Sequence, residues 1–271
     1  MKRCSCPDGI EELRVENCSS MTVVSFPKGG HEKLRSLCIG QEMNSRSSFR
    51  MLENELVIIN CPKLDGSSFV GDKLTSLEKL HIYNCRSMDA ALPGWVWPPN
   101  LRSLKLGQLK KPFSEWGPQK KFPTSLVNVE LFGGDGEDGK VSLHPQHHTS
   151  FQYLSFEDCP NLMKVSLHPQ HLTSIQHLTF EKCPNLEEVC LHPQHPTSIH
   201  HLSFQDCPKM KDLPELMFPS LLSLHIGGDC PDSIVTGSIL QEICQHSPQP
   251  DLKIMLFDSF FVDINYGFMH C

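Results

Sequence analysis

The sequence lacks a surplus of positive charge, and this absence excludes one large class of partner. Its 271 residues contain 24 Lys plus Arg against 31 Asp plus Glu, a formal net charge of −7. A protein whose main ligand is nucleic acid needs a basic surface to neutralise the phosphates. We therefore expect no nucleic-acid partner.

Long apolar runs are also missing. A membrane-spanning helix needs roughly 18 or more apolar residues in succession, and the densest apolar run here covers only residues 56–59. The N-terminal residues MKRCSCPDGIEELR contain no apolar stretch of about 7–15 residues, which a secretory signal requires. We expect a cytoplasmic chain without a membrane span.

The chain has 13 cysteines but no C-x-x-C pair, the spacing that zinc and redox sites commonly use. Six cysteines instead follow a repeat and share one column: Cys18, Cys61, Cys85, Cys159, Cys183 and Cys207. In a reducing compartment a buried thiol behaves as a small hydrophobic side chain. We predict a reduced structural column, with zinc ligation as the weaker alternative.

What the sequence does contain is a 24-residue unit written three times, at residues 141–164, 165–188 and 189–212. The first copy reads VSLHPQHHTSFQYLSFEDCPNLMK. A weaker form of its frame continues through the chain as two apolar columns, two residues apart. The first column is Leu13, Leu37, Leu56, Leu80, Leu104, Val129, Leu154, Leu178, Leu202, Leu224 and Leu252, and the second runs from Val15 to Ile254.

A period in the low twenties is too short for two packed helices and lies within the roughly 20–29 residues of leucine-rich repeats. Each unit would form one coil, and strands of successive coils would pair in parallel. Prolines before many strands disfavour helix on the return path. We predict an α/β-type leucine-rich-repeat solenoid (L domain-like) with a curved parallel sheet on the concave side, a mostly irregular or turn-like convex side and few helices.

One domain of about eleven coils is expected over residues 1–271, because each coil contacts only its neighbours. The apolar tail at residues 257–271 is predicted to cap the last coil. No nucleotide-binding domain is expected in the chain. The string G-x-x-x-x-G-K at Gly134, Gly139 and Lys140 continues with Val141, where a phosphate loop needs Ser or Thr for magnesium.

The sequence shows no nucleophile and base in a strained-turn context such as G-x-S-x-G, so we expect no enzyme, no catalytic residue and no cofactor. HPQH recurs at His144 and His147, His168 and His171, and His192 and His195. Imidazoles in such columns could bind zinc or copper. Copying of the whole unit explains their recurrence, so we assign no metal site and keep a histidine-rich metal-binding protein as an alternative.

The three copies keep their core residues and differ at the positions that alternate with them. Side chains on the concave face of a solenoid can change without disturbing the core, so these variable positions are the candidate recognition surface; drift on a solvated face is the alternative. The candidates are Glu78, Lys79, His81, Tyr83, Arg102, Lys105, Gln152, Tyr153, Ser155, Glu157, Asp158, Gln176, His177, Thr179, Glu181, Lys182, His200, His201, Ser203, Gln205 and Asp206.

Three segments carry a resemblance to a known family: LTSLEKLHIYNCRSM at residues 74–88, LPELMFPSLLSLHI at residues 213–226 and LKKPFSEWGPQKKFPTSL at residues 109–126. They resemble the C-terminal leucine-rich repeats of plant coiled-coil nucleotide-binding leucine-rich-repeat disease-resistance proteins. The resemblance implies a recognition arm for a pathogen effector or a guarded host protein, with an autoinhibitory contact to the nucleotide-binding domain. Without that domain the chain would be a fragment or a truncated product.

A second interpretation is the substrate-recruiting arm of an F-box-type ubiquitin ligase, which also uses leucine-rich repeats with cysteines. Its coils usually carry a convex helix, which the prolines disfavour. In both interpretations the partner is a protein.

Overall fold

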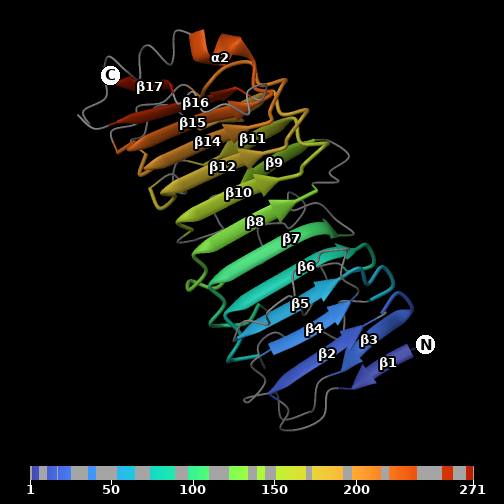
Figure 1. Ribbon diagram of the computed structural model, residues 1–271. Coiled ribbons are helices and arrows are strands. Elements are labelled where there is room, and N and C mark those ends of the chain that lie inside the picture. The colour runs from blue at the N-terminus through green and yellow to red at the C-terminus, as the bar shows by residue number, and fades with distance from the viewer. Residues whose placement is uncertain are drawn as a thin grey trace. The chain divides into compact units, whose positions relative to one another are not determined.

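A computed structural model of the chain shows two compact units, Met1–Phe132 (unit 1) and Gly133–Cys271 (unit 2). The structure describes residues 2–5, 11–16, 18–25, 36–40, 54–64, 74–88, 97–109, 122–133, 139–143, 151–168, 173–191, 197–214, 220–236, 252–258 and 267–270. Each unit is built from parallel strands that follow one another along the chain (Figure 1).

The main sheet of unit 1 has the strand order β2-β4-β5-β6-β7-β8, and neighbouring strands are parallel. The strands are β2 (Glu12–Glu16), β4 (Ser36–Gly40), β5 (Glu55–Ile59), β6 (Lys79–Cys85), β7 (Ser103–Leu109) and β8 (Asn128–Phe132). A separate parallel pair joins β1 (Lys2–Ser5) and β3 (Met21–Ser25).

The main sheet of unit 2 has the order β10-β12-β14-β15-β16-β17. Its strands are β10 (Tyr153–Glu157), β12 (His177–Glu181), β14 (His201–Gln205), β15 (Ser223–Gly228), β16 (Lys253–Asp258) and β17 (Gly267–His270). The pairs from β10 to β16 are parallel, and β17 pairs antiparallel with β16. This parallel solenoid with almost no helix in its described part confirms the predicted fold class.

The strands form because apolar residues alternate along them and stack between coils. In β10, β12 and β14 the predicted columns come into direct register, with Leu154 opposite Leu178 and Leu178 opposite Leu202. The rings of Phe156, Phe180 and Phe204 stack with centroids 5.1 and 5.2 Å apart. Each of these side chains is at most 1% exposed. One coil alone could not bury them, so the core exists only through stacking.

A column of left-handed residues lies at or next to the ends of the strands, two positions after the second apolar column. Its members have φ between 48° and 65°: Asn60, Asn84, Gln108, Gly133, Asp158, Lys182, Asp206 and Gly228. Glycine, Asn and Asp adopt this conformation most easily. The structure thus gives the variable positions Asp158, Lys182 and Asp206 a backbone role that the sequence analysis did not assign.

The return path of unit 2 contains a second sheet that the sequence analysis did not anticipate. Strands β9 (Lys140–Leu143), β11 (Lys164–Leu167) and β13 (Glu188–Cys190) pair in parallel in the order β13-β11-β9. Val165, Leu167 and Val189 are buried, so this sheet also packs on the core. The described residues contain a single helix, α2 (Asp232–Thr236).

The register of the last parallel pair differs from the prediction. Leu252 was aligned with Leu224, whereas the structure places Ile254 opposite Leu224 and Leu256 opposite Ile226. Leu252 is still buried, at 4% exposure, just before β16. The longer connection before β16 allows the strand to shift by two residues and keep its apolar side inward. The single-domain and cap assignments stay predictions.

Candidate functional site

Each main sheet has an open face, made by the side chains that alternate with the buried columns. Burial alternates between half-buried and buried along β8, β12 and β14, as expected for a strand with one solvated side. Of the predicted surface residues, thirteen occupy open-face positions of a strand: Lys79, His81, Tyr83, Lys105, Tyr153, Ser155, Glu157, His177, Thr179, Glu181, His201, Ser203 and Gln205.

Three rings form a stack on the open face of unit 2, which we call the ring ladder: Tyr153, His177 and His201. Their centroids lie 4.2 and 4.3 Å apart, and the planes are inclined by 14° and 16°. The ladder continues through a hydrogen bond of 2.6 Å between His201 Nδ1 and Ser223 Oγ. Parallel register places one ring per coil, so the ring faces cover one another and the ring edges face outward.

The two ladder histidines have a lowered pKa. Burial is the main cause for both, and the neighbouring imidazoles of His201 and His200 lower the pKa of His177 further. For His201 the second cause is His200. Burial likewise lowers the pKa of His225 in β15, whose Nδ1 lies 3.3 Å from Ser203 Oγ. The lowered pKa of His177 and His201 favours the uncharged imidazole at neutral pH.

Two further columns lie beside the ring ladder. Ser155, Thr179 and Ser203 are in direct register and form a strip of short hydroxyl side chains. Glu157, Glu181 and Gln205 are in register at the ends of the same strands. Across β10, β12 and β14 the open face of unit 2 therefore presents rings, then hydroxyls, then two carboxylates and the amide of Gln205.

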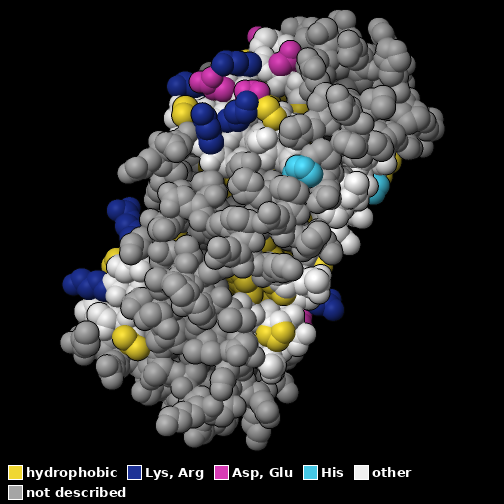
Figure 2. Space-filling model, turned by 180° about the vertical axis from the view of Figure 1, so that it is seen from behind, with side chains coloured by type: hydrophobic (Ala, Val, Ile, Leu, Met, Phe, Trp, Pro, Cys, Tyr) yellow, Lys and Arg dark blue, Asp and Glu magenta, His cyan; other side chains and the backbone are white. Residues whose placement is uncertain are grey.

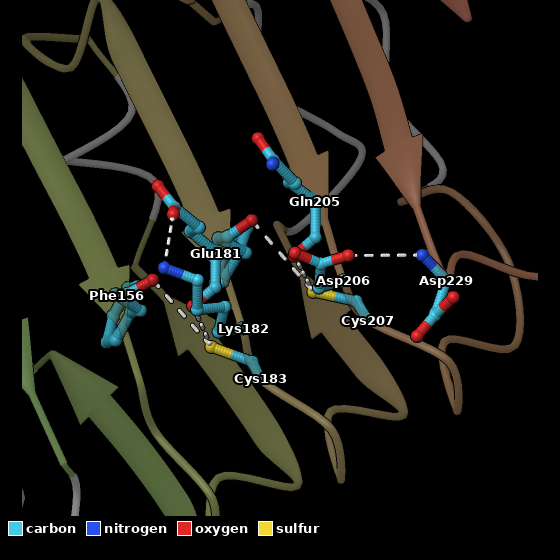
Figure 3. Close-up of polar contacts among 9 residues, drawn as sticks. Phe156, Glu181, Lys182, Cys183, Gln205, Asp206, Cys207 and Asp229 are labelled. Atoms are coloured by element: carbon cyan, nitrogen blue, oxygen red, sulfur yellow. Dashed lines mark hydrogen bonds and ion pairs between the residues drawn. The ribbon is translucent and has the colours of Figure 1, made fainter. Parts of the chain in front are cut away.

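The turns that follow these strands add more carboxylates, as Figure 3 shows for two of them. Asp206 Oδ1 accepts a hydrogen bond of 3.2 Å from the Asp229 backbone N–H. Lys182 Nζ lies 3.0 Å from Glu181 Oε1. We call Glu157, Asp158, Glu181, Asp206 and Asp229 the acidic rim; Lys182 is the cation within it.

The remaining predicted residues precede their strands: Glu78, Arg102, Gln152, Gln176 and His200. Their backbone groups continue the ladder of hydrogen bonds between coils. The Arg102 N–H donates to the Glu78 carbonyl at 2.7 Å, and the His200 N–H donates to the Gln176 carbonyl at 2.8 Å. These residues border the open face and are not part of its central columns.

On the open face of unit 1, side chains that can carry charge lie close to one another. Lys105 forms an ion pair with Glu130, and His81 Nδ1 lies 3.4 Å from Glu55 Oε1. The side chain of Glu55 is only 3% exposed. Burial, together with the charges of Lys105 and Lys79, lowers the pKa of His81 to about 4. Internal pairing leaves unit 1 with less charge to offer a partner.

Sequence reasoning missed several open-face residues: Glu55, Gly107, Asn128, Glu130, Phe132, Ser223 and His225. Extending the column alignment of the three copies to the neighbouring coils would have found them. Gly107 has a steric reason to be glycine. A Cβ there would come within 2.8 Å of both the Phe132 Cβ and the Tyr83 ring.

The predicted cysteine column lies in the core as thiols. Each thiol bonds backbone carbonyls; Cys183 Sγ, for example, donates to Glu181 at 3.4 Å and to Phe156 at 3.7 Å (Figure 3). Contact with the Cys159 thiol and burial raise the pKa of Cys183. The column therefore consists of buried thiols that bond backbone carbonyls and pack in the core as small hydrophobic side chains do.

The HPQH motif falls almost entirely outside the described residues, since only His168 is described. Within the described ranges, no three His, Cys, Asp or Glu side chains cluster in a way that could hold a metal ion. The metal-binding alternative therefore gains no support.

Charged side chains of both signs gather on the face seen from behind in Figure 2. Ion pairs of the second sheet and its flanks join Lys164 with Glu188 and Lys211 with Glu187. These exposed pairs are of a kind that contributes little to stability.

Comparison with known families supports the repeat. A family model described as BspA type Leucine rich repeat region matches residues 140–223 in six copies. No curated protein and no solved structure matches the chain. The chain thus contains a leucine-rich-repeat region, and such domains usually mediate protein interactions. The plant immune-receptor part of the resemblance stays a prediction.

The part of the chain that the structure describes contains no helix with the length and apolar character of a membrane span.

Proposed function

We propose that the chain is a non-enzymatic recognition module that binds a protein partner through the open faces of its sheets. The observation that carries this proposal is the distribution of differences among the three copies. Leu154, Leu178 and Leu202 are identical and buried, whereas the ladder positions Tyr153, His177 and His201 lie on the open face. A rigid core with a changeable sheet face is suited to recognition.

We further propose that this module is the sensor arm of a plant innate-immune receptor in the cytoplasm. It would bind a pathogen effector, a guarded host protein or its own nucleotide-binding domain. The support is the resemblance of residues 74–88, 109–126 and 213–226 to disease-resistance proteins. Among the described residues the return path carries strands and turns, with one short helix. Such a return path favours this interpretation over an F-box arm with a helix in every coil.

Proximity labelling in plant cytoplasm tests both statements. The wild-type chain fused to a biotin ligase is compared with the open-face variant Y153A/H177A/H201A and with the opposite-face variant K164A/E188A. We expect the open-face variant to lose specific labelled proteins, an effector co-expressed in the cell or a receptor nucleotide-binding domain among them. The opposite-face variant should keep them. An identical set of labelled proteins for all three chains contradicts recognition by the open face.

A further inference from the structure

The open face of unit 2 has a charge pattern that specifies its partner more closely. The acidic rim places five carboxylates, those of Glu157, Asp158, Glu181, Asp206 and Asp229, at the ends of successive strands and in the turns after them. Lys182 offsets part of this charge through its contact with Glu181. The rim therefore keeps a net negative charge.

The other two columns of this face are neutral. The ring ladder is rigid, because each ring packs against the next at 4.2 to 4.3 Å. Tyr153, at the β10 end of the ladder, is 42% exposed, and tyrosine is a side chain that protein interfaces contain in excess. Ring edges and the hydroxyls of Ser155, Thr179 and Ser203 can all form hydrogen bonds.

These columns differ in height. Serine and threonine are short, so the hydroxyl strip lies lower than the ring ladder on one side and the glutamates on the other. An extended backbone laid along this strip would meet hydroxyl groups below it, ring edges on one flank and carboxylates on the other. Side chains that reach the carboxylates must be positively charged to gain from the contact, because like charges at an interface are strongly unfavourable.

We propose that the open face of unit 2 binds an extended basic segment of a partner protein, whose arginine or lysine side chains contact the acidic rim while its backbone lies along the hydroxyl strip. This proposal rests on the proposed recognition function and names its partner class. Arginine suits the rim best, because its planar guanidinium can bond a carboxylate through two parallel N–H groups. The net charge of −7 assists the approach of a basic segment.

Fluorescence anisotropy with the full chain and labelled synthetic peptides tests the proposal. The probe is a peptide of alternating arginine and serine, and the control is a peptide of the same length with glutamate in place of arginine. We expect the arginine peptide to bind at least about tenfold more tightly at neutral pH. Equal binding of both peptides, or tighter binding of the glutamate peptide, overturns the proposal.

Two variants with the same change in charge distinguish binding at the acidic rim from a general attraction between the negatively charged chain and the basic peptide. E157Q/E181Q removes two carboxylates of the open face, and E187Q/E188Q removes two from the second sheet and its flank. The first variant should lower the affinity for the arginine peptide about five- to tenfold, in keeping with the loss of two partly exposed charge contacts. The affinity of the second variant for the arginine peptide should stay within about twofold of that of the wild-type chain. Equal weakening by both variants shows charge attraction alone and contradicts the proposal.

The ring ladder provides an uncharged test. The variant Y153A/H177A/H201A should bind the arginine peptide at least about tenfold more weakly than the wild-type chain. Its circular dichroism spectrum should be unchanged. If the arginine peptide fails to bind while the open-face variant still loses labelled proteins in cells, the basic partner is wrong and the recognition function stands. If the peptide binds at the rim but the open-face variant labels the same proteins in cells as the wild-type chain, the recognition function is wrong.

Discussion

Two separate features favour glycine at position 228. Its φ is +65°, in the left-handed region, which costs other residue types roughly 1–2 kcal/mol. A Cβ on Gly228 would also lie 1.8 Å from Asp206 Oδ1, the atom that accepts the hydrogen bond of the Asp229 N–H. The left-handed backbone and the neighbouring carboxylate therefore act together at one turn.

We expect Gly228→Ala to reduce the free energy of unfolding by about 2 kcal/mol, measured by urea denaturation. The double variant D206A/G228A separates the two causes, because removing the carboxylate removes the collision. In the D206A background the cost of G228A should fall toward the backbone term of about 1 kcal/mol. An unchanged cost in both backgrounds would show that Asp206 does not contact this site.

His81 shows how the open face of unit 1 depends on pH. Its folded-state pKa of about 4 lies below the ordinary value of 6.5, so the unfolded chain binds more protons between these two values. Stability is complete above about pH 6.5 and decreases as the pH falls toward 4. The difference of roughly 2.5 pKa units corresponds to at most about 3.4 kcal/mol of stability.

We expect an NMR titration to place the His81 midpoint below pH 5. Denaturation at pH 7 and pH 5 should show a loss of stability in the wild-type chain that H81Q reduces, because glutamine does not titrate. A midpoint near 6.5 would contradict the effect of burial.

At the scale of the element, a strand of this protein is defined by which of its side chains face the core. Leu178 and Thr179 are adjacent in β12, yet Leu178 is 0% exposed and Thr179 lies on the open face. The same substitution at these two positions should therefore change stability by very different amounts.

Leu178→Asp should abolish cooperative unfolding of unit 2 or lower its stability by more than about 4 kcal/mol, because it places an unpaired charge in the core. Thr179→Asp should change stability by less than about 1 kcal/mol. Thermal melts followed by circular dichroism measure both variants. Similar melting curves for the two would refute the assignment of β12 faces.

At the scale of the whole molecule, stability is the sum of contacts between neighbouring coils. Phe180 stacks between Phe156 and Phe204, with ring centroids 5.1 and 5.2 Å apart. Removing the Phe180 side chain should therefore destabilise β10, β12 and β14 most. The strands of unit 1 contain none of these residues.

We expect Phe180→Ala, which removes a side chain worth about 3–5 kcal/mol, to reduce hydrogen-exchange protection in β10, β12 and β14. Protection in β5, β6 and β7 should remain close to that of the wild-type chain. Hydrogen exchange with mass spectrometry resolves these segments. Uniform loss of protection across both units would mean that the chain unfolds as a single cooperative body.

The sequence by itself determined the coil, the parallel pairing and the inward columns. Three near-identical copies leave only one way to stack: Leu154, Leu178 and Leu202 must come into register to escape water. The same periodicity placed Tyr153 and its counterparts on the opposite side of the sheet.

Only the tertiary structure decided the features that depend on backbone dihedrals and on contacts between coils. The left-handed turns include Lys182 and Gln108, and neither residue type predicts a left-handed backbone. The second sheet forms from residues that the 24-residue unit also repeats, Val141, Val165 and Val189, and their pairing across coils is visible only in the structure. The shifted register of β16 and the contact of His81 with Glu55 likewise depend on how neighbouring strands lie against each other. Periodicity predicts which side chains share a face, and contacts between neighbouring coils determine what that face can bind.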